Sequence, residues 1–122
     1  MIELADVHVT LSSAAGPVHI LRGVDLAVAA GSSASVVGPS GSGKSTMLAV
    51  VGGIERPTSG RVRIDGQDLS ALNEDRLATF RGQEIGILFQ AFHLIPTMTA
   101  LENVAVPLEL AGERHALLLA AR

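Results

Sequence analysis

Cysteine, tryptophan and tyrosine are absent from this sequence of 122 residues, and phenylalanine occurs only three times. Without cysteine the chain has no disulfide framework and no thiolate site, which fits a reducing compartment. The core must be aliphatic, and few rings are present on which nucleic acid bases could stack. The formal net charge is −3, with acids and arginines interspersed, so no basic stripe exists and we expect no nucleic acid partner. No apolar run approaches about 18 residues, and we expect a soluble cytosolic chain without a membrane span of its own.

The order of apolar residues predicts an α/β fold. Hydrophobic residues make up 48% of the chain, enough for the core of one domain or part of one. Apolar residues alternate over 2–11 and 19–31, on either side of a loop at 12–17, which predicts two antiparallel strands. The continuous apolar runs at 34–38 and 85–89 are typical of parallel strands buried on both faces. We therefore expect an antiparallel β subdomain followed by part of a parallel core sheet with flanking helices.

Local start and stop signals predict the helices. Asn73 is a plausible N-cap. Thr99 and Glu102 have the spacing of a capping box, whereas Pro107 should kink or interrupt the helix that they begin. The expected helical segments run from Lys44 to a stop at Gly52-Gly53, over 73–83, over 99–111 and over 113–122.

The only lysine, Lys44, lies in the run "GPSGSGKST" between a predicted strand and a predicted helix. Gly38, four residues, Gly43, Lys44 and Ser45 satisfy the phosphate-loop pattern. Glycines let successive N–H groups point toward phosphate oxygens, and the helix adds its positive dipole end. Lys44 supplies a compact charge for the β- and γ-phosphates, and Ser45 offers a hydroxyl to Mg²⁺. The alternative is a glycine-rich turn with an exposed lysine, but a chance match is on the order of a few per thousand.

Three segments carry a likeness to a known family: "ASVVGPSGSGKSTMLAVVGGIERPTSG", "IDGQDLSAL" and "IGILFQAFHLIPTMTALENVAVPLELAG". Over essentially all of residues 1–122 the chain resembles the N-terminal half of the nucleotide-binding domain of ABC transporters. The stretch "FQAFHLIPTMTALENV" is most similar to the lipoprotein-releasing and macrolide-exporting branch. The resemblance implies an incomplete P-loop NTPase fold of ABC type, with a phosphate loop at 38–46, a Q-loop around 90 and the start of a helical subdomain at about 99–122.

The resemblance also implies roles for particular residues. Lys44 would be catalytic as well as phosphate-binding, and Ser45 would ligate Mg²⁺. Gln90 matches the Q-loop glutamine, which touches the metal or the attacking water and relays the nucleotide state to the membrane subunit. The plainer interpretation of Gln90 is a polar residue that ends a buried strand. The residues that would bind ATP are Gly38, Pro39, Ser40, Gly41, Ser42, Gly43, Lys44, Ser45 and Thr46.

Two partners follow from the same likeness: a transmembrane permease subunit and a second nucleotide-binding domain. Residues 91–103 would lie near the surface that receives the permease. The chain would then be cytoplasmic and peripheral on the inner face of the cell membrane, held there through the permease.

The sequence departs from the family in two respects. The position of the aromatic residue that usually stacks on adenine corresponds here to Leu11, so we expect weaker nucleotide binding through the base, while binding through the phosphates should survive. The chain has no run of four hydrophobic residues followed by Asp-Glu and no "LSGGQ"-like signature. Phosphoryl transfer needs several groups acting together, so we expect binding of Mg-ATP without hydrolysis by this chain alone.

Two other interpretations remain at this stage. A small P-loop kinase or GTPase would need its own base-reading element, and an Asn-Lys-x-Asp stretch cannot occur because Lys44 is the only lysine. A non-functional gene fragment would fold poorly, because the family's sheet places further strands between 34–38 and 85–89.

Overall fold

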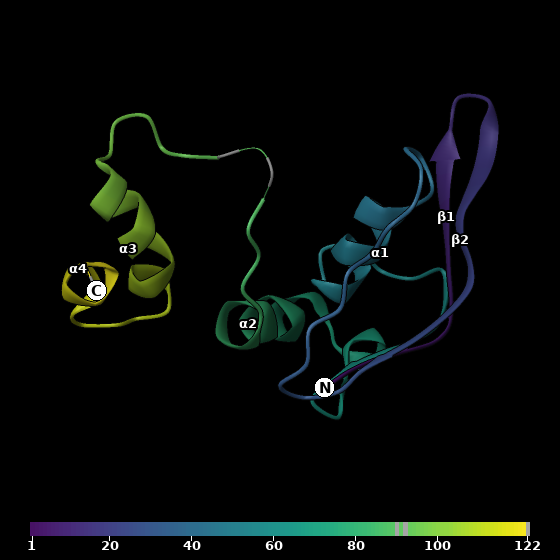
Figure 1. Ribbon diagram of the computed structural model, residues 1–122, viewed down its shortest axis with the longest axis horizontal. Helices are drawn as coiled ribbons and strands as arrows, with labels where there is room; N and C mark the ends of the chain where they lie inside the picture. The colour runs from purple at the N-terminus through teal and green to yellow at the C-terminus, as the bar shows by residue number, and fades with distance from the viewer. Residues whose placement is uncertain (90, 92, 122) are drawn as a thin grey trace. The chain divides into compact units, whose positions relative to one another are not determined.

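The computed structural model describes residues 1–89, 91 and 93–121 and divides into two compact units, Met1–Leu77 and Ala78–Arg122. The described part contains no helix long and apolar enough to cross a membrane. Along the chain the elements are β1 (Ile2–Ser13), β2 (Gly16–Val28), α1 (Lys44–Val51), β3 (Ser59–Ile64), β4 (Gln67–Asp68), the 3₁₀ helix η1 (Leu69–Ala71), α2 (Glu74–Glu84), α3 (Ala100–Leu110) and α4 (Ala116–Ala120) (Figure 1).

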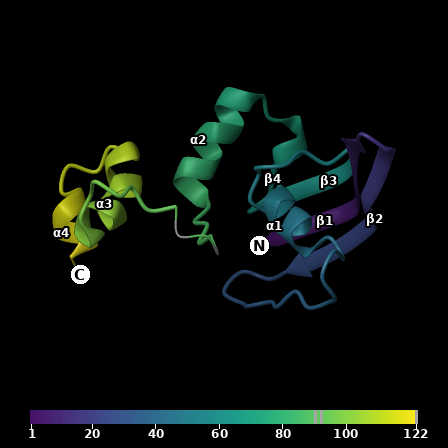
Figure 2. The same cartoon turned by 90° about the horizontal axis from the view of Figure 1, so that it is seen from above.

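The first unit is built on an antiparallel sheet with the strand order β2-β1-β3-β4 (Figure 2). One face of the sheet is apolar and buried, because inward and outward residues alternate along β3. Val50 of α1 is only 1% exposed and lines the same small cavity as Val62 of β3, so α1 covers this face. The buried apolar residues of this unit are Leu4, Val7, Val9, Leu21, Val50, Val62, Ile64, Leu69 and Leu77.

A β-bulge in β1 explains why two buried residues lie three positions apart. The pairing with β2 shifts between Leu4 and Val7, and Asp6 between them has a φ of 48°. The extra residue restores the inward direction of Val7. Gly60 of β3 makes the bulge possible, because a Cβ atom there would lie 2.2 Å from the main-chain oxygen of Asp6. The N–H of Asp6 donates to Asp25 Oδ1 at 2.8 Å.

The antiparallel β subdomain is as predicted, but the prediction of buried strands at 34–38 and 85–89 is wrong for these residues. Both segments lack strand structure, and Val37 and Leu88 are 87% and 100% exposed. A strand needs a neighbour that accepts and donates its ladder hydrogen bonds. Among the described residues no strand pairs with either segment. The predicted loop at 12–17 is also shorter, since β1 continues to Ser13 and β2 begins at Gly16.

The predicted helices are confirmed as α1, α2, α3 and the short α4. Asn73 caps α2 by accepting a hydrogen bond from the Arg76 N–H at 2.9 Å. Thr99 and Glu102 form the predicted capping box of α3. Pro107 does not interrupt α3, which runs to Leu110, and the Ala111 N–H donates to the Pro107 oxygen at 3.1 Å. The helix continues because proline removes only one donor, while its own carbonyl still accepts.

Candidate nucleotide-binding site

The glycine-rich loop runs directly into the N-terminus of α1. Gly43 is the N-cap of this helix, with a φ of 91° in the left-handed region. A Cβ atom on Gly43 would lie 3.1 Å from Leu21 Cδ2 and 3.2 Å from the main-chain oxygen of Ile20. Glycine therefore serves two needs here: the backbone conformation and the close approach of the loop to β2.

The Lys44 side chain turns back onto the loop that precedes it. Its Nζ atom donates to the main-chain oxygens of Gly38 at 2.8 Å and Pro39 at 2.6 Å, and to Ser42 Oγ at 3.4 Å. The three protons of the ammonium group thus meet three acceptors. The positive charge is held inside the curve of the loop rather than extended into solvent. Sequence reasoning predicted the lysine but not these backbone acceptors.

An open hollow of about 520 Å³ lies over the helix N-terminus. Small-molecule sites commonly have volumes of about 300–1,000 Å³. The hollow brings together several of the predicted binding residues and one that was not predicted, Ile20 of β2. The residues that line it are Ile20, Ser40, Gly41, Gly43, Lys44, Ser45 and Thr46.

The electrostatics of this hollow favour an anion. The first turn of α1 carries no acidic residue, so no negative charge on the helix itself offsets the positive end of its dipole. The amides of the first turn have no intrahelical acceptors. Lys44 adds a full positive charge beside them. Together these groups suit the oxygens of a phosphate chain.

A metal ion at this site would depend on Ser45. Among the described residues no group of three or more histidine or acidic side chains is placed to hold a metal ion. Ser45 lies in the first turn of α1 and is one of the residues that line the hollow. A hydroxyl oxygen fits Mg²⁺, which binds through few protein ligands when phosphate oxygens and water complete its shell.

An aliphatic surface lies near the turn that closes the β1–β2 hairpin. Leu11 pairs directly with Val18, and the two residues are 40% and 44% exposed. Ile20, two residues beyond Val18 on β2, lines the hollow. Strand β2 therefore contributes Val18 to the aliphatic surface and Ile20 to the hollow. Neither β1 nor β2 contains phenylalanine, tyrosine or tryptophan.

Gln90, the second predicted catalytic and metal-binding residue, lies outside the described residues. Of its described neighbours, Phe89 and His93 place their rings edge to face with centroids 5.2 Å apart. His93 has a φ of 47°. The structure therefore leaves the role of Gln90 as a prediction.

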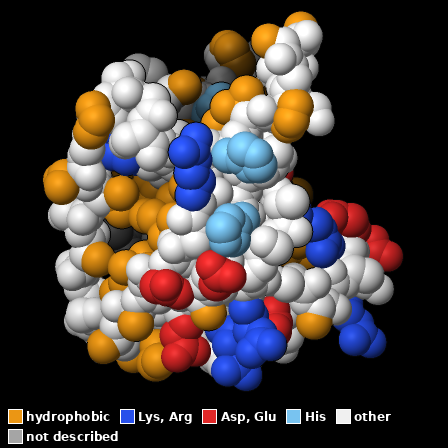
Figure 3. Space-filling model, turned by 90° about the vertical axis from the view of Figure 1, so that its right-hand side faces the viewer, with side chains coloured by type: hydrophobic (Ala, Val, Ile, Leu, Met, Phe, Trp, Pro, Cys, Tyr) orange, Lys and Arg blue, Asp and Glu red, His pale blue; other side chains and the backbone are white. Residues whose placement is uncertain are grey.

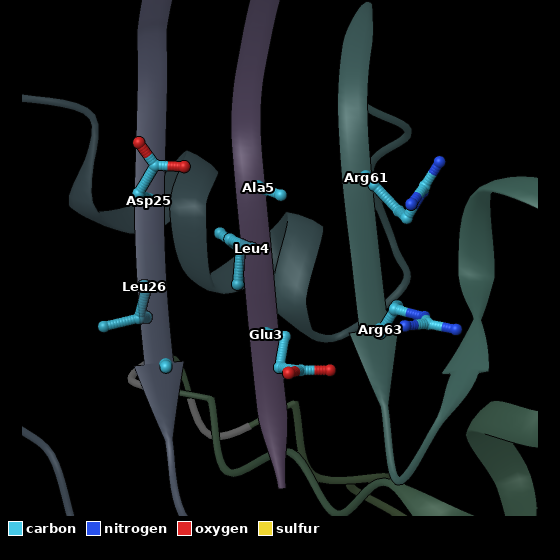
Figure 4. A pocket seen from close by; sticks show the side chains of 8 residues that line it. Glu3, Leu4, Ala5, Asp25, Leu26, Arg61 and Arg63 are labelled. Carbon is cyan, nitrogen blue, oxygen red and sulfur yellow. The ribbon is translucent and has the colours of Figure 1, made fainter.

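Two other polar features of the first unit do not match the phosphate chemistry. On the face in Figure 3 histidine side chains lie near acidic ones, and His8 Nε2 is 3.0 Å from Asp6 Oδ1. A trough of about 430 Å³ extends over β2, β1 and β3, and its lining includes the acidic residues Glu3 and Asp25 and the basic residues Arg61 and Arg63 (Figure 4). Its lining combines both charge signs, and it lacks a glycine loop or helix N-terminus. The hollow over α1 is the better candidate.

A glycine loop that enters a helix N-terminus and holds a lysine within its curve has the geometry typical of a P-loop. The model of the family described as "ABC transporter" matches residues 21–121. This chain belongs to the ABC transporter family.

Individual relatives agree with this assignment. The lipoprotein-releasing system ATP-binding protein LolD of Anaeromyxobacter dehalogenans is 53% identical over 104 residues, which cover 84% of this chain and 44% of the relative. The macrolide export ATP-binding/permease protein MacB of Syntrophobacter fumaroxidans is 45% identical over 112 residues, which cover 92% of this chain and 16% of the relative. The chain spans about half the length, or less, of the curated relatives it matches.

Two solved structures have a backbone fold similar to that of this chain. The dimeric structure of MJ0796, a bacterial ABC transporter cassette, has a TM-score of 0.85 at 44% identity and matches 90% of this chain and 47% of that one. The dimeric post-hydrolysis state of the same cassette, bound to ADP and Pi, has a TM-score of 0.89 at 38% identity, with 99% and 54% covered. The chain thus has the fold of part of an ABC cassette.

Proposed function

We propose that this chain supplies the ATP-binding half-site of an ABC transporter ATPase of the lipoprotein-releasing or macrolide-exporting type. Residues 38–46 bind the phosphates of Mg-ATP. Lys44 contacts the β- and γ-phosphates, and Ser45 ligates the metal. Gln90 senses the metal or the attacking water.

The observation that carries this proposal is the position of the Lys44 ammonium group. It lies within the loop at 2.6 Å and 2.8 Å from two main-chain oxygens, beside the N-terminus of α1. A lysine that only solubilised the surface would extend into water. A cation held within the loop, beside the N-terminus of α1, supports the proposal that residues 38–46 bind phosphate.

Hydrolysis is a separate matter from binding. The sequence contains no acidic pair after a hydrophobic run, and an attacking water needs a positioned base or equivalent group. We therefore expect the 122-residue chain to bind Mg-ATP and to release phosphate at no more than the rate of a Lys44→Ala variant. Membership of the ABC transporter family argues against the kinase or GTPase interpretation.

We further propose two protein partners. The names of the macrolide and pyoverdine export relatives combine an ATP-binding part with a permease, and the solved cassettes are dimeric. By analogy this chain would contact a permease through residues 91–103 and pair with a second cassette. A peripheral position on the inner face of the membrane would follow from the permease contact.

The test is a calorimetric titration of the purified chain with ATP, with and without Mg²⁺. Lys44→Ala should weaken binding by about 10- to 100-fold, the effect of losing a hydrogen bond to a charged group. Ser45→Ala should remove most of the Mg²⁺ dependence. Arg63→Ala is the matched control, because Arg63 is a cation of the same unit on the exposed sheet face. Equal affinity of the wild type and Lys44→Ala would overturn the proposal.

Hydrogen exchange on the same sample addresses the remaining interpretation, a fragment that folds poorly. Protected amides along β1 and α1 are expected for a folded binding unit. Uniformly fast exchange together with absent ATP binding would favour a non-functional fragment.

A further inference from the structure

The outer face of the sheet carries acidic and basic side chains on different strands. Arg61 and Arg63 lie on β3 and alternate with buried Val62, which faces α1, so both arginines belong to the opposite face. The trough on this face also takes Glu3 from β1 and Asp25 from β2 (Figure 4). Acids thus lie on one side of the trough and arginines on the other.

Two alanines keep the middle of the trough open. Ala5 pairs with Arg61, and Ala27 pairs with Glu3. Figure 4 shows Ala5 of β1 in one row between Asp25 of β2 and Arg61 of β3. The outer two strands of this row are two strand spacings apart, about 10 Å. Because the alanine side chain is short, the space between the carboxylate and the guanidinium is not filled.

One charged side chain on each side of the trough is anchored. Asp25 Oδ1 accepts from the Asp6 N–H at 2.8 Å. Arg61 Nε lies 3.4 Å from Asp68 Oδ2 of β4. A carboxylate has a second oxygen and a guanidinium has five N–H donors, so both anchored groups keep polar atoms for a ligand.

The other charged pair, Glu3 and Arg63, does not form an ion pair. The two residues are direct cross-strand partners, a position in which Cβ atoms lie about 5 Å apart. Nevertheless, the ion pairs found within the described part of the chain include neither residue. Both side chains therefore keep their full capacity to bind water or a ligand of opposite charge.

The spacing of the charges selects the length of a ligand. The acids lie over β2 and β1 and the arginines over β3, so the centres of the two groups are one and a half strand spacings apart, about 7 Å. Two extended amino acid residues span about 7 Å. A dipeptide with free termini has an ammonium group at one end, which seeks acceptors, and a carboxylate at the other, which arginine binds through two parallel hydrogen bonds.

We propose that this trough is a binding site for a small zwitterion, a short peptide with free termini. Its ammonium group binds between Glu3 and Asp25, and its carboxylate binds Arg61 and Arg63. The site lies on the sheet face opposite α1, so it goes beyond nucleotide binding and does not depend on it. Exposed charge pairs contribute little each, and we expect a dissociation constant on the order of millimolar.

The test is an NMR titration of the chain with the dipeptide alanyl-alanine. Amide shifts of β1, β2 and β3 should change and saturate. The N-acetylated dipeptide lacks the ammonium group and the C-terminal amide lacks the carboxylate, so each should bind at least about fivefold more weakly. Free alanine, whose two charges are on one carbon atom, should also bind more weakly.

Two variants remove one charge from each side of the trough. Asp25→Asn keeps an oxygen for the Asp6 N–H, and Arg63→Gln keeps a polar side chain; each should weaken dipeptide binding at least about fivefold. Arg22→Gln is the matched control, because Arg22 is an exposed cation of β2 that does not line the trough. Its affinity for the dipeptide should equal that of the wild type.

The inference is overturned if the wild type shows no saturable shifts, if the N-acetylated dipeptide binds as well as the free one, or if Arg63→Gln binds like the wild type. A loss in Arg22→Gln equal to that in Arg63→Gln would also overturn it, since only the total charge would then matter. Mg-ATP affinity should be the same in all these variants. Absent Mg-ATP binding in the wild type would contradict the proposed function and not this site.

Discussion

The Nζ atom of Lys44 lies 2.6 Å from the main-chain oxygen of Pro39, closer than to either of its other two acceptors. This bond joins the first residue of α1 to the second residue of the loop. The ammonium group therefore orders a segment whose glycines and serines have few side-chain contacts of their own. A bound phosphate would replace neutral carbonyl acceptors by ionised oxygens, which form stronger hydrogen bonds with a cation.

Lys44→Arg should weaken ATP binding about tenfold, which corresponds to about 1.4 kcal/mol, although the charge is unchanged. The planar guanidinium directs its N–H groups in a fixed fork, whereas the three acceptors of Lys44 surround a single point. The same variant should loosen the loop, because a longer planar group cannot occupy the point at which the ammonium nitrogen meets the Gly38 and Pro39 oxygens. Calorimetric titration gives the affinity.

Ser42→Ala is the control for a change within the loop that leaves Lys44 in place. It removes only the longest of the three contacts, at 3.4 Å, and should change the affinity less than about twofold, about 0.4 kcal/mol. Equal binding by Lys44→Arg and the wild type would mean that only the charge matters and that the compact geometry is irrelevant.

Leu11→Tyr should tighten the binding of ATP. Leu11 pairs with Val18 at the end of the hairpin whose β2 strand also supplies Ile20 to the hollow. An aromatic ring gives a base a stacking surface worth about 1–3 kcal/mol, so we expect an increase in affinity of about fivefold or more. Inorganic triphosphate has no base and should bind both proteins equally.

Leu110→Tyr is the control for this change. Leu110 is 84% exposed at the end of α3, and a ring there should leave ATP affinity as it is. If Leu11→Tyr increases the affinity for inorganic triphosphate as much as the affinity for ATP, the ring acts on the loop rather than on the base.

The sequence predicted those features whose causes are local. Asn73 caps α2 and Thr99 pairs with Glu102 at α3 because each side chain bonds groups about three residues away. The spacing of glycine and lysine in the loop at 38–46 is likewise a local feature of the sequence. Helix starts and the loop motif could therefore be identified from the printed residues alone.

Features that depend on distant parts of the chain could not be predicted. The contact of Gly43 with Ile20 and Leu21 joins residues from separate elements, and nothing near either end of the contact signals it. The apolar runs at 34–38 and 85–89 have the composition of buried strands. Composition does not supply the neighbouring strand that a ladder requires, and both segments are exposed in this structure.

Gly60→Ala should strongly destabilise the first unit. Gly60 has a φ of 91°, and its new Cβ atom would lie 2.2 Å from the Asp6 oxygen, which belongs to the backbone of the bulge and cannot move away alone. We expect a loss of more than about 4 kcal/mol in the free energy of unfolding, the range of severe core changes. Urea unfolding followed by circular dichroism measures it.

Gly66→Ala separates the clash from the backbone conformation. Gly66 has a φ of 82° and nothing within 4 Å of its added Cβ atom. Only the left-handed conformation is then penalised, at about 1–2 kcal/mol. Similar losses in the two variants would show that the contact between Gly60 and the bulge is not what limits stability.

Acid should loosen the start of α3. The Thr99 hydroxyl is the main cause of the lowered pKa of Glu102, and the Thr99 N–H is the second. A lowered pKa in the folded state means that the ionised form is the stabilising one. Its contribution is complete above the ordinary value of 4.5 and disappears as the pH falls below that value through the folded pKa.

The corresponding measurement is the exchange of the Thr99 and Asn103 amides between about pH 6 and about pH 3, corrected for intrinsic rates. In the wild type their protection should fall over the lower part of this range. Glu102→Gln keeps an oxygen acceptor but cannot ionise, so its protection should be lower at about pH 6 and nearly independent of pH. If Glu102→Gln loses protection with the same pH profile as the wild type, another carboxylate controls the start of α3, and the capping box does not.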